Sequence, residues 1–253
     1  LDNAFCTNSI SVPSRAAILT GQYSHLNGVY TLDDALRPEQ DNIAKRLQQA
    51  GYRTALIGKW HLKKEPAGFD YYSVFHDQGT YRDPVFKTAE NWMDDDKGVG
   101  GAVEKGFSTD LVTDKAIRWI KERDRTKPFS VFCHFKATHE PCDFPERFAH
   151  LYDGVKFPEP ENLLEFGPAK SGRTFAGQPL ETMAWRWNKA YTDPENWWTY
   201  YPELPFCGVE GDSVANRRAI YQKLVRDYLR CAAAIDDNIG RLLRTLDEDC
   251  LLY

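Results

Sequence analysis

Three short stretches of the chain carry polar residues whose types and order suit the handling of a tetrahedral anion. The first reads Ser-Val-Pro-Ser-Arg-Ala-Ala-Ile-Leu-Thr-Gly, from Ser11 to Gly21. Pro13 suits the entry into a helix, Ser14 is a good N-cap, and Gly21 is a good helix stop. We therefore expect Ser11 in the turn just ahead of a helix N-terminus, where free N–H groups and the helix dipole favour an anion.

Arg15 adds a positive charge close to this serine. Its planar guanidinium presents several N–H donors in a fixed fork, which matches the oxygens of a tetrahedral oxyanion. Taken alone, Ser-x-Pro-Ser-Arg is a pattern that occurs by chance at many helix starts. The motif therefore needs support from the rest of the chain.

The second stretch comes directly after an expected strand. Residues 52–57 are typical of a buried strand, and Gly-Lys-Trp-His follows at positions 58–61. In open α/β sheets, functional groups gather at the carboxyl ends of strands. Lys59 and His61 are two residues apart, so in an extended segment both side chains point to the same side. A Lys-x-His pair of this kind is otherwise most often a surface pair.

The third stretch follows another expected strand, residues 129–135. It contains Lys136 and His139 in the sequence Lys-Ala-Thr-His-Glu-Pro. A histidine at such a position is more often structural than catalytic. His134, inside the strand, is expected to be a core or sheet-packing residue.

The first two stretches resemble the two signatures of the type I sulfatases, a formylglycine-dependent family of the alkaline phosphatase superfamily. Residues 11–21 match the first signature at every position, and residues 51–61 resemble the second, in the expected order. The resemblance implies that Ser11 is oxidised after synthesis to formylglycine, the catalytic aldehyde. It also implies a bacterial enzyme of the Ser type, matured by a radical-based, formylglycine-generating maturase.

The same resemblance implies a role for each candidate. Lys59 would hold the sulfate and the formylglycine oxygen, and His61 would be the base that collapses the sulfated intermediate. His139 would donate a proton to the leaving alcohol, whereas Lys136 is a candidate for substrate binding at the rim of the site. The implied catalytic residues are Ser11, Arg15, Lys59, His61 and His139.

Calcium is the metal that the resemblance implies, with Ser11, as formylglycine, among its ligands. The family pattern places the other ligands on an earlier strand ending in Asp-Asp and a later one ending in Asp-Asn or Asp-Gln. The chain starts after the former and stops before the latter, so we expect residues 1–253 to be a partial sulfatase catalytic domain. Because calcium takes about six oxygen ligands, we expect weak calcium binding and little activity from these residues alone.

Helix and strand patterns alternate along the chain. Helices are expected at 41–50, with Asp41 as the cap, and at 108–123 and 216–248. Helices that alternate with buried strands favour a mostly parallel sheet. The resemblance implies an α/β fold of the alkaline-phosphatase type, a three-layer α/β/α sandwich that is incomplete at both chain ends.

Two segments break this alternation. Residues 70–101 are rich in turns and aromatic residues, and the three aspartates at 94–96 are expected to form a solvated acidic turn, because the EF-hand spacing is missing. Residues 152–213 are an irregular, aromatic-rich excursion with two open interpretations. The rings either pack on one another or form a wall of the substrate pocket, since indole faces suit sugar rings. We expect packing for most of them.

The composition is that of an ordinary globular protein, with 42% hydrophobic and 27% charged residues. The net charge of −5, without a block of lysines and arginines, argues against a nucleic-acid partner. No apolar run reaches the roughly 20 residues that cross a bilayer, so no membrane partner is expected. The resemblance implies a periplasmic or secreted protein.

The expected function is hydrolysis of sulfate esters, with a sulfated carbohydrate as the substrate. An alternative is a phosphonate or phosphate monoester hydrolase of the same superfamily, because sulfate and phosphate pockets differ little. A different class is a non-catalytic sulfoglycan-binding protein with an unmodified Ser11. Intact mass separates these classes, because formylglycine is about two mass units lighter than serine.

Overall fold

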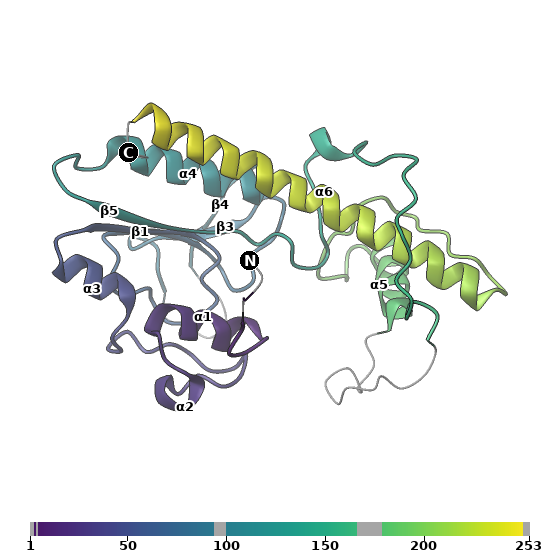
Figure 1. Ribbon diagram of the computed structural model, residues 1–253, viewed down its shortest axis with the longest axis horizontal. Coiled ribbons are helices and arrows are strands. Elements are labelled where there is room, and N and C mark those ends of the chain that lie inside the picture. Colours follow the sequence, from purple (N-terminus) through teal and green to yellow (C-terminus); the bar gives the residue numbers. More distant parts are fainter. Residues whose placement is uncertain (1–2, 4, 94–99, 166–178, 250–253) are drawn as a thin grey trace. The chain divides into compact units, whose positions relative to one another are not determined.

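The computed structural model describes residues 3, 5–93, 100–165 and 179–249 of the chain (Figure 1). It divides into two compact units. Unit 1 comprises residues 1–136 and 238–253, and unit 2 comprises residues 137–237. Each unit is described by itself below. The acidic turn expected at 94–96 lies outside the described residues.

A five-stranded sheet forms the middle of unit 1, with the strand order β4-β3-β2-β1-β5. Strand β1 lies between β2 and β5 and runs parallel to both, whereas β3 and β4 are joined by antiparallel pairing. In the parallel part, Leu56 lies opposite Tyr72 on one side and Phe132 on the other. The strands are β1 (Arg53–Gly58), β2 (Tyr71–Phe75), β3 (Val85–Lys87), β4 (Ala102–Val103) and β5 (Phe129–His134).

The sheet is therefore mixed: β2, β1 and β5 are parallel on one side, and β3 and β4 add antiparallel pairing on the other. The strands expected at 52–57 and 129–135 are confirmed as β1 and β5. The turn-rich segment 70–101 also contains β2 and β3, which the sequence analysis did not predict. The sequence of β2, Tyr-Tyr-Ser-Val-Phe, carries the aromatic and β-branched residues that fit a pleated, buried surface.

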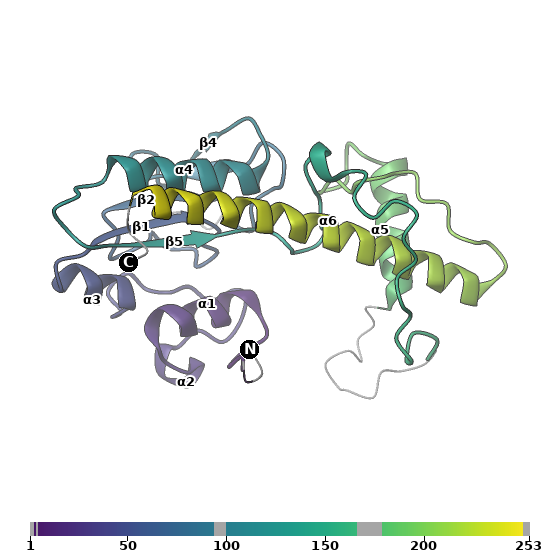
Figure 2. The ribbon, with the colours of Figure 1, turned by 45° about the horizontal axis from the view of Figure 1, so that its top comes forward.

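Helices cover both faces of this sheet, which gives unit 1 three layers (Figures 1 and 2). On one face lie α1 (Ser11–Thr20), α2 (Ser24–Asn27) and α3 (Ile43–Gln49). On the other face lie α4 (Ser108–Glu122) and the C-terminal part of α6 (Ser213–Glu248). Asn238 of α6 donates a hydrogen bond to Asp110 of α4 at 2.8 Å. The expected α/β/α layering is thereby confirmed for unit 1.

The cap of α3 is Asn42, so the prediction of Asp41 is wrong. The side-chain oxygen of Asn42 accepts from the N–H of Lys45 at 3.0 Å, and its amide donates to the carbonyl of Ala67 at 3.1 Å. Asp41 pairs with Arg46 at the surface instead. An amide serves here because it can cap the helix and bind the neighbouring loop at once.

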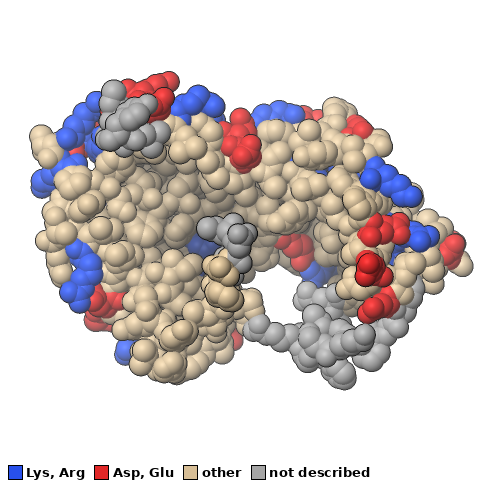
Figure 3. All heavy atoms as spheres, in the orientation of Figure 1, with Lys and Arg blue, Asp and Glu red and all other residues tan. Residues whose placement is uncertain are grey.

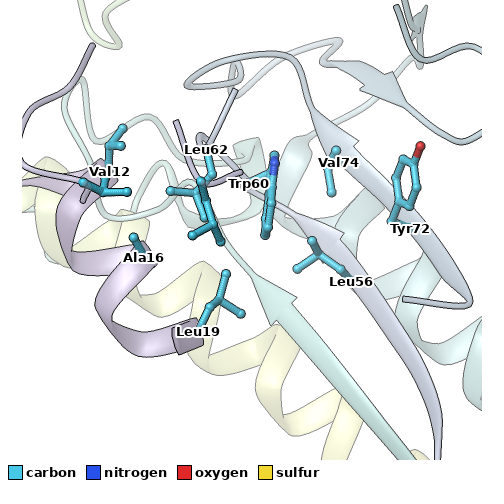
Figure 4. Close-up of a cluster of buried hydrophobic side chains, with 10 residues drawn as sticks. Val12, Ala16, Leu19, Leu56, Trp60, Leu62, Tyr72 and Val74 are labelled. Carbon is cyan, nitrogen blue, oxygen red and sulfur yellow. The ribbon is translucent and has the colours of Figure 1, made fainter. Parts of the chain in front are cut away.

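One hydrophobic cluster joins α1 to the sheet (Figure 4). Val12 directly follows Ser11 and is fully buried, and Trp60 lies between Lys59 and His61 and is almost fully buried. The packing of these apolar neighbours fixes the places where the polar side chains emerge. The cluster contains Val12, Ala16, Leu19, Val29, Leu36, Leu56, Trp60, Leu62, Tyr72 and Val74.

Unit 2 is built around α5 (Leu180–Thr192) and the N-terminal part of α6, with a short 3₁₀ helix at Glu146–Phe148. Trp187 and Tyr201 are buried at its centre, as the packing interpretation of residues 152–213 expects. Trp198, in contrast, is 66% exposed. The helix α5 was not predicted, and residues 166–178 of this segment lie outside the described part of the chain.

A buried arginine ties α6 to the loops of unit 2. Arg230 is 1% exposed, and its guanidinium donates to the carbonyl of Leu151 at 2.8 Å and to Asp153 at 2.6 Å. It also pairs with Glu203. These three partners come from loops that are distant from α6 in the sequence, so Arg230 holds together segments that have no regular structure of their own.

The surface carries charges of both signs. On the face that Figure 3 shows, lysine and arginine side chains are interspersed with aspartate and glutamate side chains. Among the helices that the structure describes, none combines the length and the apolar character that crossing a bilayer requires.

Candidate active site

Ser11 is the first residue of α1, so it lies within the first turn of the helix and not ahead of it. Ile10 is the N-cap, and its carbonyl accepts from the N–H of Ser14 at 3.0 Å. The helix thus begins earlier than an N-cap at Ser14 would give. Pro13 fits inside the first turn, because N–H groups there have no partner within the helix. Gly21 ends the helix with a φ of 66°, as predicted.

Two side chains contact the hydroxyl of Ser11. His61 Nδ1 lies 3.0 Å from the Ser11 Oγ, and Arg15 Nε donates to the same oxygen over 3.3 Å. Arg15 is one helical turn after Ser11, on the same face of α1. His61 comes from the segment that follows β1. The structure therefore brings the two signatures together at one hydroxyl.

Arg15 also binds the backbone of the second signature. Its Nη1 donates to the carbonyl of Lys59 at 2.8 Å and lies 3.4 Å from His134 Nδ1. Burial lowers the pKa of Arg15 to about 10, which leaves the guanidinium charged at neutral pH. A fixed positive charge therefore lies beside Ser11.

His134 is part of this site, although the sequence suggested only a packing role. Burial, with the charge of Arg15, lowers its pKa to about 4, so the ring is neutral at pH 7. Its Nδ1 lies 3.2 Å from the carbonyl of Lys59. His134 thus helps to hold the backbone at Lys59.

Lys59 is buried, with 3% of its surface exposed, and its Nζ donates to Gln78 Oε1 at 2.5 Å. Burial, followed by the charges of Arg15 and Lys136, lowers the pKa of Lys59 to about 7. A bound anion would favour the charged form of this amine. Lys59 can therefore take up a proton when an anion binds.

Lys136 joins the same cluster from the end of β5. It is 7% exposed, and its Nζ lies 3.5 Å from the backbone oxygen of Gln78 and 5.3 Å from the centre of the Tyr81 ring. The side chain is buried near Lys59 and does not lie on an exposed rim, and the role of Lys136 in substrate binding stays a prediction. Two lysines and one arginine thus concentrate positive charge at the carboxyl ends of β1 and β5.

Asp77 contacts the far side of His61, with 3.2 Å between Asp77 Oδ1 and His61 Nε2. The hydrogen bond to His61 holds the pKa of Asp77 below its usual value. Asp77 and Gln78 were both missed by the sequence analysis. They follow β2 as residues 59–61 follow β1, so recognition of β2 as a parallel strand would have marked them.

His139 belongs to unit 2, whereas the other candidate residues belong to unit 1. Its side chain is exposed, and Nδ1 lies 2.7 Å from the carbonyl of Glu140. The structure brings Ser11, Arg15, Lys59, His61 and Lys136 into one cluster in unit 1. The proton-donating role of His139 stays a prediction.

The residues around Ser11 do not fit calcium. Calcium takes about six oxygen ligands, many of them carboxylates, whereas this site gathers Arg15, Lys59 and Lys136 around a single carboxylate, Asp77. Among the described residues, no group of three or more His, Cys, Asp or Glu side chains is placed to hold a metal ion.

The chain matches the family model Sulfatase over residues 1–252. The N-acetylglucosamine-6-O-sulfatase of Bacteroides thetaiotaomicron is 37% identical, over 98% of this chain and 48% of that protein. A solved structure of a protein in complex with its substrate, D-glucosamine-2-N,6-O-disulfate, is 34% identical, with a TM-score of 0.80. That match covers 98% of this chain and 54% of the other. The chain thus spans about half the length of these relatives.

A more distant match shares the fold. The phosphonate monoester hydrolase of Silicibacter pomeroyi is 20% identical, with a TM-score of 0.51, over 94% of this chain and 50% of that protein. The likeness concerns architecture alone. Together with the closer matches, it confirms the expected fold class.

Proposed function

Because the chain belongs to the sulfatase family, we propose that it forms part of a sulfuric ester hydrolase that acts on sulfated glycans. One observation supports this above all: the Ser11 hydroxyl is contacted by both a half-buried arginine and a histidine. The name of the related enzyme and the ligand of the solved complex favour a 6-O-sulfated glucosamine as the substrate.

Arg15 and Lys59 would hold the sulfate group. Lys59 is buried and Arg15 is half-buried, so their charges would act on the sulfate oxygens with less screening by water than at the surface. The first turn of α1, which begins at Ser11, would add backbone N–H groups that can bind an anion. Charge that develops on the sulfuryl oxygens during transfer is stabilised by groups that are already in place.

His61 would handle the proton at the Ser11 position. Its Nδ1 is within hydrogen-bond distance of Ser11 Oγ, and Asp77 orients the ring from the opposite nitrogen. Formylglycine at this position would supply, when hydrated, two hydroxyls on one carbon, so that sulfate can be expelled without attack by a second water. His139 would protonate the departing alcohol.

Several parts of the proposal come from the family. They are the conversion of Ser11 by a maturase, a calcium ion in the complete protein and a periplasmic or secreted location. The assignment of residues 1–253 to a partial catalytic domain is a proposal of the same kind. No step above depends on calcium.

The test uses the full-length protein that carries this chain, isolated from its native host. Mass spectrometry of the peptide with Ser11 should show a loss of about two mass units, and D-glucosamine 6-sulfate should be hydrolysed. Ser11→Ala should abolish turnover, whereas Ser14→Ala, on the same helix, should retain it. Turnover by Ser11→Ala at the wild-type rate would contradict the proposal.

The same assay decides between the alternatives. Faster turnover of D-glucosamine 6-phosphate than of the 6-sulfate would favour a phosphate monoester hydrolase. Binding of the sulfated sugar without turnover, with serine intact at position 11, would favour a sulfoglycan-binding protein.

A further inference from the structure

Gln78 contacts both lysines of the site and carries no charge of its own. Its side-chain Oε1 accepts from Lys59 Nζ at 2.5 Å, and its backbone oxygen lies 3.5 Å from Lys136 Nζ. Both lysines are buried, and a buried ammonium group usually pairs with a carboxylate. At Gln78, an amide occupies the place where a carboxylate would be expected.

Because its partner is an amide, the Lys59 ammonium is not neutralised by the group that accepts its hydrogen bond. A neutral oxygen orients an ammonium group through a hydrogen bond but does not cancel its charge. Arg15 and Lys136 both act against the charged form of Lys59, so the free site holds cations that repel one another. An arriving anion relieves this repulsion and supplies the negative charge that position 78 lacks.

The other charged groups around Lys59 have partners of their own. Arg15 binds Ser11 and the carbonyl of Lys59. Asp77 is bound to His61, and its weak effect on Lys59 is the smallest of the influences on that amine. The neutral His134 contacts the backbone of residue 59. The Lys59 ammonium therefore depends on Gln78 for its orientation.

We propose that Gln78 is a positioning residue, which aims Lys59 at a sulfate oxygen without pairing the Lys59 ammonium with a negative charge. This inference rests on the proposed function, because it takes sulfate as the anion. A glutamate at this position would hold Lys59 equally well, but its ion pair would compete with the substrate. Gln78 thus makes the lysine available to the ligand.

Two substitutions separate the hydrogen bond from the charge. Gln78→Glu keeps the acceptor and adds a negative charge, whereas Gln78→Met keeps the size and removes the acceptor. Gln49→Glu, at an exposed position in α3, adds the same charge away from the lysines. Thermal unfolding checks that each variant of the 253-residue chain is folded.

The first readout is the titration of the Lys59 ammonium, followed by NMR of the lysine side chains. The pKa of about 7 in the wild type should rise in Gln78→Glu and fall further in Gln78→Met. A residue that serves only for packing would not shift the titration in opposite directions. Shifts in the same direction, or no shift, would overturn the proposal.

The second readout is the binding of inorganic sulfate, measured by calorimetry. Gln78→Glu should weaken it about tenfold or more, because the new carboxylate competes for Lys59, whereas Gln49→Glu should bind like the wild type. Equal binding by Gln78→Glu and the wild type would overturn the role of Gln78 and leave the proposed function standing. Opposite titration shifts without any sulfate binding would support the hold of Gln78 on Lys59 and contradict sulfate as the ligand of Lys59 in this chain, whereas turnover by the full-length protein tests the proposed function separately.

Discussion

Lys59 shows that function and stability compete at a single residue. The amine is buried beside Arg15 and Lys136, and its pKa is about 7 instead of 10.5. The unfolded chain therefore binds more protons than the folded one between these two values, and stability rises with pH across that window. Below it, the full cost of burying the charge is present.

We expect Lys59→Met to stabilise the chain at low pH. The gain should be about 2 kcal/mol below pH 7, because an apolar side chain avoids the cost of the buried charge. It should shrink as the pH rises from 7 toward 10.5, because the folded chain loses the Lys59 proton first, and it vanishes above 10.5, where the amine is neutral in both states. Urea unfolding across this range measures it, with the exposed Lys127→Met as the control. A gain that grows with pH would contradict this interpretation.

At the scale of residues, the sequence was informative where a motif was complete. The two signatures predicted that Ser11, Arg15, Lys59 and His61 would meet, and the structure brings them together. Asp77, Gln78 and His134 could not be found in this way. Their roles come from neighbours that are distant in sequence, since β2 and β5 must first align beside β1.

Among the elements, β1 ends at a glycine because of close packing with β5. Gly58 has a φ of +96°, and a Cβ at this position would lie 2.0 Å from the backbone oxygen of His134. The contact cannot be relieved by rotating a side chain. The backbone hydrogen bond from Lys59 to His134, at 2.7 Å, depends on the same close approach.

Gly58→Ala should therefore destabilise unit 1 strongly. We expect a loss of about 3 kcal/mol or more, from strain at positive φ and from the backbone clash. Gly28→Ala is the matched control, because Gly28 also has a positive φ but open space around it. It should cost about 1 kcal/mol. Equal losses in urea unfolding would show that the contact with His134 is unimportant.

The N-terminus of α3 offers a second test at this scale. Asn42→Ala removes the bond to the N–H of Lys45 and the bond to the carbonyl of Ala67. We expect a loss of about 1–2 kcal/mol in the free energy of unfolding. Asp41→Ala breaks a surface ion pair and should cost less than about 1 kcal/mol. A larger loss for Asp41→Ala than for Asn42→Ala would indicate that Asp41 is the cap.

Elements with long, regular patterns were the predictable ones. The amphipathic spacing of α4 and α6 and the apolar runs of β1 and β5 gave their positions to within a few residues. The short strands β3 and β4 could not be predicted, because three and two residues carry too little periodicity. These two strands depend on β2, because β3 pairs with the edge of β2.

The chain as a whole combines two units that are stabilised in different ways. Unit 1 has a layered apolar core around a sheet, and unit 2 adds buried ion pairs of Asp227 with Lys223 and Arg230 to a small aromatic core. The sequence predicted the irregular character of much of unit 2. It did not predict the division into units, because the contacts of Arg230 join loops far apart in sequence.

We expect Arg230→Met to destabilise unit 2 by about 3 kcal/mol. Methionine fills part of the volume but leaves the carbonyl of Leu151 and the carboxylate of Asp153 without their donor. Hydrogen exchange should rise in the loops of unit 2 and stay unchanged in β1. Arg218→Met, at a half-exposed ion pair on the same helix, should have little effect. An equal rise in hydrogen exchange in both units would contradict the local role of Arg230 in unit 2.

The backbone at Lys59 has a consequence for how such a pocket can change. Its N–H is bound to the end of β5 and its carbonyl to Arg15, and neither bond uses the lysine side chain. The location of residue 59 is thus set by hydrogen bonds of the main chain and does not depend on its side chain. Different side chains could be exchanged there, and the preference for one anion over another retuned, while the scaffold that presents them stays the same.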